Sequence, residues 1–154
     1  MVLERGGRNM KPKKSKTLSQ LTKEADKAFS RAIRLRDGEI RGGVWVSQCI
    51  TCDAWRPLTT MHAGHFQSRR FKATRWDEEN VNAQCAGCNM FGSGEQYKYG
   101  LALDLKYGDG TAKKLVKKAH QVFKVKRDYL EEVISDAKTE INWYEDNLIN
   151  KDNK

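Results

Sequence analysis

The sequence predicts a small α+β protein, in which a zinc-stapled core of short strands follows one long helix and precedes a helical C-terminal half. Three observations support this prediction. All four cysteines fall between residues 49 and 88, as two Cys-x-x-Cys pairs. Apolar residues recur at helical spacing before the first pair and again after the second. Between the pairs, glycines and short β-type runs replace that spacing.

Length and charge limit the possible functions. A chain of 154 residues predicts one domain with a modest core. The net charge of +9 and the pI of about 9.4 favour a polyanionic partner, with nucleic acid ahead of an anionic membrane. No apolar run approaches the roughly 18 residues of a membrane span, and no signal-peptide pattern opens the chain. We therefore expect a cytoplasmic protein.

The first segment, residues 1–16, is strongly basic. It contains six lysines and arginines against one acid, with two glycines and a proline interspersed. Such a composition buries too little apolar surface to offset the entropy of ordering, so we expect a disordered tail. The tail is either a solvated segment without a specific role or an arm that contacts phosphates.

A long amphipathic helix is predicted from Leu18 to Leu35, because apolar residues recur there every three or four positions. Thr17 and Gln20 have the spacing of a capping box at its start. Asp37 and Gly38 form a natural stop. The polar face of this helix is basic, which is expected either for a solvated surface or for phosphate contact.

The central segment reads as short strands and turns. Residues 44–46 form a β-type run before the first cysteine pair, and a second strand is expected to begin within 57–62 and end near Phe66. A short helix is predicted to start at Cys85 or Ala86 and to run to the glycine-rich residues 92–94.

Helices are predicted for the rest of the chain. One covers 95–107, a second begins with Thr111 as its cap and runs to about Phe123, and a third covers 126–148. The apolar positions of the third are close to a heptad, so it either packs within the molecule or forms a homodimer with another copy. Residues 150–154 read as frayed. The resulting organisation is a tail at 1–16, a core with its preceding helix at 17–110, and a C-terminal helical region at 111–154.

The two cysteine pairs predict a structural zinc site. Each Cys-x-x-Cys turn points two thiolates at one metal, and two turns complete a tetrahedral shell. Without export the thiols should stay reduced, which favours metal over disulfides. Disulfides, a redox pair and four unrelated buried thiols are the alternatives. The expected ligands are Cys49, Cys52, Cys85 and Cys88.

Polar side chains between and just after the pairs are candidates for chemistry. They are His62, His65, Asn80, Asn82 and Asn89. A phosphodiester hydrolase needs a base to deprotonate water and a cation to neutralise the scissile phosphate. Histidine titrates near neutral pH, which suits a base, and histidine and asparagine can both bind a divalent cation.

Basic and aromatic residues surround these candidates. Residues 54–76 contain no acid but include Arg69, Arg70, Lys72 and Arg75, with aromatic residues interleaved. Positive charge beside aromatic rings is typical of a surface that contacts nucleic acid. A basic run is otherwise most often a solvated surface.

The spacing of these residues resembles that of the HNH (ββα-metal) nucleases. Here Asn80 is followed after four residues by Cys85, Ala86, Gly87, Cys88 and Asn89, which matches the end of the HNH signature. The likeness narrows to the phage NinG (Rap) recombination endonucleases. Its motifs are Cys-Ile-x-Cys, Ala-Gly-His-Phe at 63–66, Asn-x-x-x-Gln-Cys-x-x-Cys-Asn at 80–89 with the following Ser-Gly at 93–94, and the Lys-Tyr-Gly that ends at Gly108. The likeness covers about residues 18–120.

This resemblance implies a ββα-metal fold and an endonuclease that cleaves branched recombination intermediates of the Holliday junction or D-loop type. It implies that His65 is the general base and that Asn80 holds the loop that orients His65. It further implies that Asn89 binds a catalytic Mg²⁺ or Mn²⁺, with His62 as the candidate second ligand. The place of action would be the host cytoplasm, and the DNA partner would be branched.

Two positions depart from the family pattern, since relatives carry Asp or His where this chain has Gly64, and Asp where it has His62. The rival function is a non-catalytic, zinc-dependent module that binds nucleic acid. A nuclease-like protein that has lost its catalytic metal is a third possibility.

Overall fold

The structure, a computed structural model, describes residues 14–149. The predictions for most of the basic tail and for residues 150–154 therefore lie outside the described residues. The elements in chain order are α1 (Leu18–Arg36), β1 (Gly38–Arg41), β2 (Val44–Gln48), β3 (Trp55–Pro57), η1 (Leu58–Thr60), β4 (Met61–His65), β5 (Val81–Cys85), η2 (Gly87–Phe91), α2 (Gln96–Tyr107), α3 (Thr111–Ala119), α4 (Arg127–Tyr144) and η3 (Glu145–Ile149). The α+β class is confirmed.

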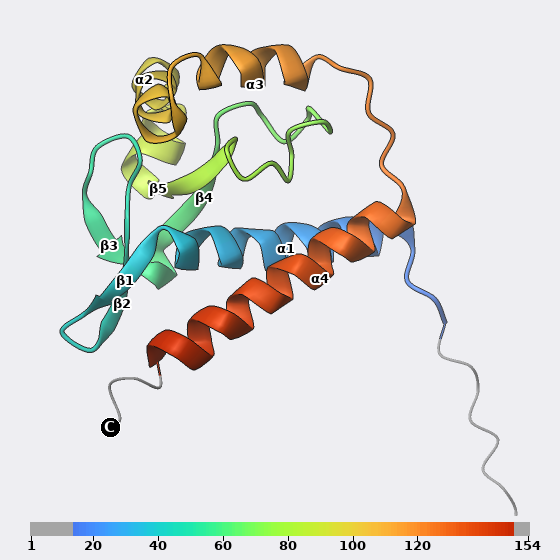
Figure 1. The fold of residues 1–154 in the computed structure, drawn as a ribbon, viewed down its shortest axis with the longest axis horizontal. Coiled ribbons are helices and arrows are strands. Elements are labelled where there is room, and N and C mark those ends of the chain that lie inside the picture. Colours follow the sequence, from blue (N-terminus) through green and yellow to red (C-terminus); the bar gives the residue numbers. More distant parts are fainter. Residues whose placement is uncertain (1–13, 150–154) are drawn as a thin grey trace, which may run out of the picture.

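A two-stranded antiparallel sheet of β4 and β5 lies at the centre, with α1 and α4 on one side and α2 and α3 on the other (Figure 1). A second sheet, in the order β1-β2-β3, lies beyond the C-terminal end of α1. The loop 66–80 joins β4 to β5 and passes between the two helical layers (Figure 1). The central sheet therefore lies between the two helical layers, and it also contacts the second sheet through β2.

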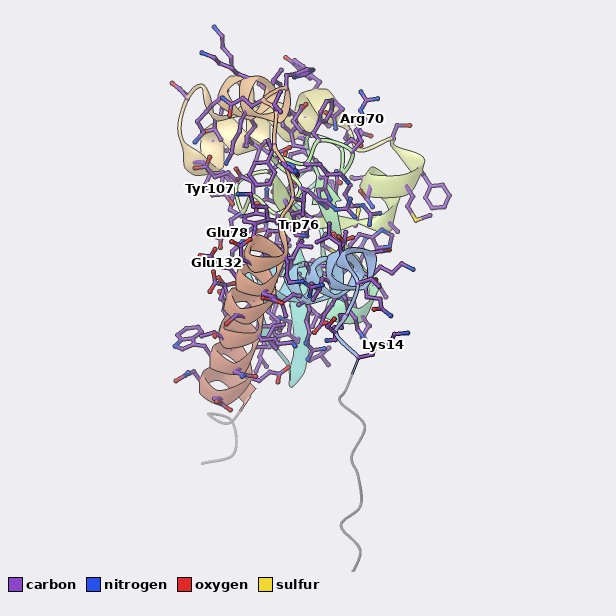
Figure 2. All side chains as sticks on the ribbon, turned by 90° about the vertical axis from the view of Figure 1, so that its right-hand side faces the viewer. Lys14, Arg70, Trp76, Glu78, Tyr107 and Glu132 are labelled. Atoms are coloured by element: carbon purple, nitrogen blue, oxygen red, sulfur yellow. The ribbon has the colours of Figure 1, made fainter. Side chains whose placement is uncertain are left out.

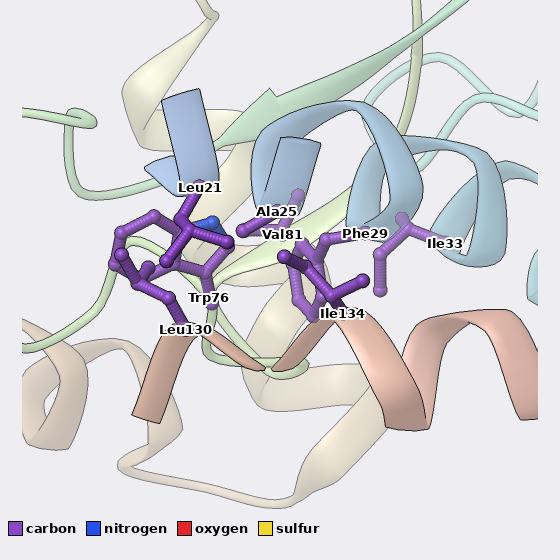
Figure 3. Close-up of a cluster of buried hydrophobic side chains, with 8 residues drawn as sticks. All are labelled: Leu21, Ala25, Phe29, Ile33, Trp76, Val81, Leu130 and Ile134. Atoms are coloured by element: carbon purple, nitrogen blue, oxygen red, sulfur yellow. The ribbon is translucent and has the colours of Figure 1, made fainter. Parts of the chain in front are cut away.

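Helix α1 begins as the sequence predicts. Thr17 is its N-cap, and both hydrogen bonds of the capping box with Gln20 are present, at 2.8 and 3.2 Å. Such a cap is worth about 1 kcal/mol of helix stability. The apolar face of α1 packs into the largest core cluster (Figure 3). That cluster contains Leu21, Ala25, Phe29, Ile33, Trp76, Val81, Leu130 and Ile134.

Helix α4 contributes Leu130 and Ile134 to this cluster and lies beside α1 along its length (Figures 1 and 3). Lys138 of α4 also pairs with Glu24 of α1 at 3.0 Å. The near-heptad apolar face of α4 is thus used within the molecule, the first of the two alternatives. A homodimer through this helix stays a prediction, which a single chain does not test.

Three strands were not anticipated from the sequence, and one of them is β3, which pairs with β2 in the second sheet. Strand β1 follows α1 directly and pairs with β2 through a tight turn at Gly42 and Gly43, whose φ angles are +56° and +76°. Strand β5 reads Val-Asn-Ala-Gln-Cys, and asparagine is normally depleted from strands. Here Asn82 is buried with hydrogen-bond partners from other elements, so tertiary contacts override the local preference.

Two helix boundaries were also wrong. The residue at the N-cap of α3 is Gly110, and Thr111 is the first helical residue, whose Oγ1 donates to the Gly108 carbonyl at 2.7 Å. The helix ends at Ala119, and Val122 beyond it is fully exposed, so the expected extension to Phe123 had no core to cover. Within residues 14–149, no helix combines the length and apolarity that crossing a membrane requires.

Candidate active site and metal centre

The four cysteines form one cluster, as predicted. Cys49 and Cys52 flank the turn after β2, Cys85 ends β5, and Cys88 lies in η2. All four sulfur atoms lie within 4.8 Å of one another, and no pair forms a disulfide. The Sγ atoms of Cys52 and Cys85 are 3.8 Å apart, and ligands about 2.3 Å from a tetrahedral zinc would be separated by about 3.8 Å. The cluster therefore fits a structural metal ion.

The β4–β5 ladder joins this metal centre to the candidate base. Met61 pairs with Cys85 at one end of the ladder, and His65 pairs with Val81 at the other. One of the four cysteines, Cys49, also packs with Met61 and Ala83 in a small buried apolar cluster. A metal that holds Cys85 therefore also holds the strand pair on which His65 is displayed.

His65 is half-buried, and the main-chain carbonyl of Arg75 accepts a hydrogen bond from its Nε2 at 2.9 Å. A carbonyl oxygen can only accept, so Nε2 carries the proton and Nδ1 carries the lone pair. Burial lowers the pKa of His65 below the ordinary histidine value, and the positive charge of Arg69 acts in the same direction. His65 is therefore a neutral base at physiological pH, with Nδ1 as its basic atom.

Asp26 of α1 fixes the segment that holds His65, and the sequence reasoning missed it. Its carboxylate accepts hydrogen bonds from Nε and Nη2 of Arg75, at 3.0 and 2.5 Å, and from the indole N–H of Trp76 at 3.1 Å. A bidentate pair of this kind fixes orientation as well as position. In the sequence, Asp26 is one of two acids, with Glu24, in a helix whose polar face is otherwise basic.

Asn80 is fully buried and holds the loop 66–80 closed. Its side-chain oxygen accepts from the Gln67 amide at 2.7 Å, and its nitrogen donates to the carbonyls of Gln67 and Thr74, both at 2.9 Å. The side chain thereby ties the start of the loop to the segment just before Arg75. Asn80 thus holds the loop closed, and its role in orienting His65 for catalysis stays a prediction.

His62 and Asn89 come together from β4 and η2, with Asn89 Nδ2 donating to His62 Nδ1 at 2.9 Å. Neighbouring ligands of an octahedral ion with bonds of about 2.1 Å would lie about 3.0 Å apart. An asparagine binds metal through Oδ1, so cation binding would require the Asn89 amide to turn over and release His62. A shared cation ligated by these two side chains stays a prediction.

These groups line one hollow of about 330 Å³. Asp26 and Arg34 of α1, His62 and His65 of β4, Arg69 and Arg75 of the loop, and Asn89 of η2 contribute to its wall. A second hollow, of about 490 Å³, shares His65, Arg69 and Asn89 with the first. His65 and Asn89 therefore line both hollows. We call the two hollows together the cleft.

The four basic residues proposed for DNA binding differ in their surroundings. Arg69, Arg70 and Lys72 are exposed on the loop. Arg75 is half-buried, and its guanidinium is engaged with Asp26. The charge available to a phosphate therefore comes from the first three residues. The Arg75 side chain instead pairs with Asp26, and this pair fixes the position of the Arg75 main-chain carbonyl that accepts from His65.

Packing explains the glycine at position 64. A Cβ atom built on Gly64 would lie 2.2 Å from Oε1 and 2.8 Å from Cβ of Gln84. Gln84 is itself buried and donates to the Gly94 carbonyl at 2.9 Å, which fixes the end of the segment that follows η2. The departure from the family pattern at Gly64 is thus accompanied by a glutamine that fills the space.

Asn82 belongs to a structural network on the far side of β5. Its Oδ1 accepts from Arg36, Lys106 and Tyr107, each at 2.9 Å. Asp37 binds Arg36 and Lys106 in the same network and accepts from the main-chain amide of Ala83 at 2.8 Å. The network joins α1, β5 and α2, which gives the Lys-Tyr pair at the end of α2 a role in folding.

Comparison with known protein families gives one match. A family model described as "Bacteriophage Lambda NinG protein" matches residues 3–146. No curated protein and no solved structure matches the chain.

Proposed function

This chain belongs to the bacteriophage lambda NinG family, and on that premise we propose that it is a metal-dependent endonuclease that cleaves branched DNA. The substrates we propose are recombination intermediates of the Holliday junction or D-loop type, in the cytoplasm of the host cell. The observation that carries the proposal is His65, whose Nε2 is committed to a carbonyl, whose Nδ1 is basic, and which lines a hollow with His62 and Asn89.

In the proposed reaction, Nδ1 of His65 accepts a proton from a water molecule as that water attacks the scissile phosphorus. The bond between phosphorus and the 3′ oxygen then breaks, and the departing oxygen takes a proton from water, which leaves a 5′-phosphate and a 3′-hydroxyl. A Mg²⁺ or Mn²⁺ ion held by Asn89 and His62 would neutralise charge on the phosphate and on the departing oxygen. Arg69, which lines both hollows, would bind a phosphate oxygen beside His65.

The charge of the cleft supports a nucleic-acid substrate. Asp26 is the only carboxylate among the described residues that line the two hollows, and Arg75 neutralises it. The exposed residues Arg69, Arg70 and Lys72 contact phosphates in the proposed complex. Such contacts position a protein on DNA but carry no base information. We therefore propose selection by DNA shape rather than by sequence.

Cleavage of DNA of different shapes tests the proposed function. We expect the purified protein with Mg²⁺ to cleave a four-way junction and a fork faster than a linear duplex of equal length. Competition binding at matched salt should show the same preference, because a junction brings several backbones within reach of separated basic surfaces. Equal affinity and equal cleavage for all three would contradict shape selection. Zinc-dependent binding without cleavage would support the non-catalytic module instead.

Loss of the candidate cation ligands should change the metal requirement. We expect His62→Ala and Asn89→Ala to need at least about tenfold more Mg²⁺ for half-maximal cleavage, because each removes a metal-binding group. Asn89→Asp should retain the wild-type requirement, since a carboxylate oxygen also binds Mg²⁺. Asn142→Ala, an exposed change on α4, is the matched control. A magnesium titration unchanged in both alanine variants would place the cation elsewhere.

A further inference from the structure

Two apolar side chains project from the turn that carries Asn89. Met90 is 61% exposed and Phe91 is 84% exposed, and they occupy the last two positions of η2. A single exposed apolar residue is ordinary on a protein surface. This pair differs because it directly follows Asn89, which lines both hollows.

The turn beneath these side chains is held in several ways. Cys88 belongs to the metal-binding cluster. The amide of Gly92 donates to the Gly87 carbonyl at 2.7 Å, and the amide of Gly94 donates to the Cys88 carbonyl at 2.9 Å. The turn is π-helical, as is η3 at the end of α4. The ring of Phe91 is therefore displayed on a support that is anchored both to the metal centre and to β5.

The surroundings have the charge that a nucleic acid needs. The hollow beside the turn is lined by His65, Arg69, Phe71 and Asn89, and no carboxylate is among the described residues that line it. The Arg70 guanidinium lies 4.7 Å from the centre of the Phe71 ring. Figure 2 shows Arg70 and the pale yellow-green turn of η2 on the same side of the molecule. Aromatic rings beside exposed positive charge are the usual components of a surface that binds unpaired nucleic-acid strands.

We propose that Phe91, with Met90 beside it, stacks on an unpaired base of the DNA strand that enters the cleft. This inference rests on the proposed function and deepens it, because it names a residue that distinguishes branched from linear DNA. In an intact duplex both faces of each base are covered by neighbouring pairs. A branch point or a gap leaves a base face open, and only such a site offers the ring a partner.

The experiment measures binding by the full-length protein without added divalent cation, so that no cleavage occurs. The probes are a duplex with a short single-stranded gap and an intact duplex of equal length. Phe91→Ala should bind the gapped DNA about 5- to 150-fold more weakly, the loss expected for one stacked base, and should bind the intact duplex as the wild type does. Phe91→Trp should restore binding to the gap.

The matched control is Leu105→Ala, because Leu105 is 89% exposed on α2 and lies outside the cleft. Equal zinc content in all variants would show that the fold is kept. No loss on gapped DNA, or the same loss on both probes, would overturn the proposal. A protein that binds gaps through Phe91 but never cleaves would refute the nuclease and keep the stacking role. A nuclease whose Phe91→Ala variant binds normally would do the reverse.

Discussion

Replacing His65 with alanine is expected to slow DNA cleavage by about 10²–10⁴-fold, the usual cost of removing a general base, while DNA binding stays nearly unchanged. The expectation follows from geometry, since the Arg75 carbonyl takes Nε2 and leaves Nδ1 to accept the proton. The side chain is only half-buried, so its loss should not collapse the core. Single-turnover cleavage with saturating protein separates the chemical step from binding.

The pH dependence of the wild-type reaction provides a second check. A general base works only in its neutral form, and burial lowers the pKa of His65 from the ordinary value of 6.5. The single-turnover rate should therefore stay high through neutral pH and fall on the acid side, with its midpoint below pH 6.5. A midpoint above that value would mean that another group is the base.

Asn142→Ala is the control for this variant too, since Asn142 is exposed on α4 and lines neither hollow. It should cleave at the wild-type rate. Full activity in His65→Ala would remove the proton-transfer role from this residue. Loss of cleavage together with loss of binding would instead assign His65 to substrate contact.

Replacing Cys85 with serine is expected to release the bound metal and to unfold most of the protein. Metal binding to structural zinc sites supplies about 10–16 kcal/mol in small peptides, which is comparable with the whole stability of a domain at about 5–15 kcal/mol. Cys85 also ends β5, so its loss frees the strand that pairs with His65. The variant should bind less than one zinc per chain and lose its cooperative thermal transition.

Removing the metal from the wild-type protein with a chelator is the appropriate comparison. All four cysteines belong to the cluster, so no cysteine is left for a neutral control substitution. A strong chelator should reproduce the behaviour of Cys85→Ser, and added zinc should reverse it in the wild type alone. One zinc per chain in the untreated protein is the expected content. A well-folded wild-type protein that contains no zinc would contradict the structural role.

Local patterns in the sequence were sufficient for several features. The capping box of Thr17, the apolar stripe of α1 and the cysteine spacing each depend on residues within about four positions of one another, and the structure confirms all three. Helical periodicity also predicted α2 and α4. The prediction failed for β5, because side chains from α1 and α2 satisfy the buried Asn82, a residue type that locally disfavours a strand.

By itself, then, the sequence determined the helices and the metal cluster, since helix caps, apolar periodicity and Cys-x-x-Cys turns are short-range properties of the chain. Only the tertiary structure decided what surrounds His65 and His62. The hydrogen bond from His65 spans 10 residues, that between Asn89 and His62 spans 27, and the pair of Arg75 with Asp26 spans 49. Contacts at such separations form only after α1, the sheet and the loop have packed together, and no local periodicity encodes that packing.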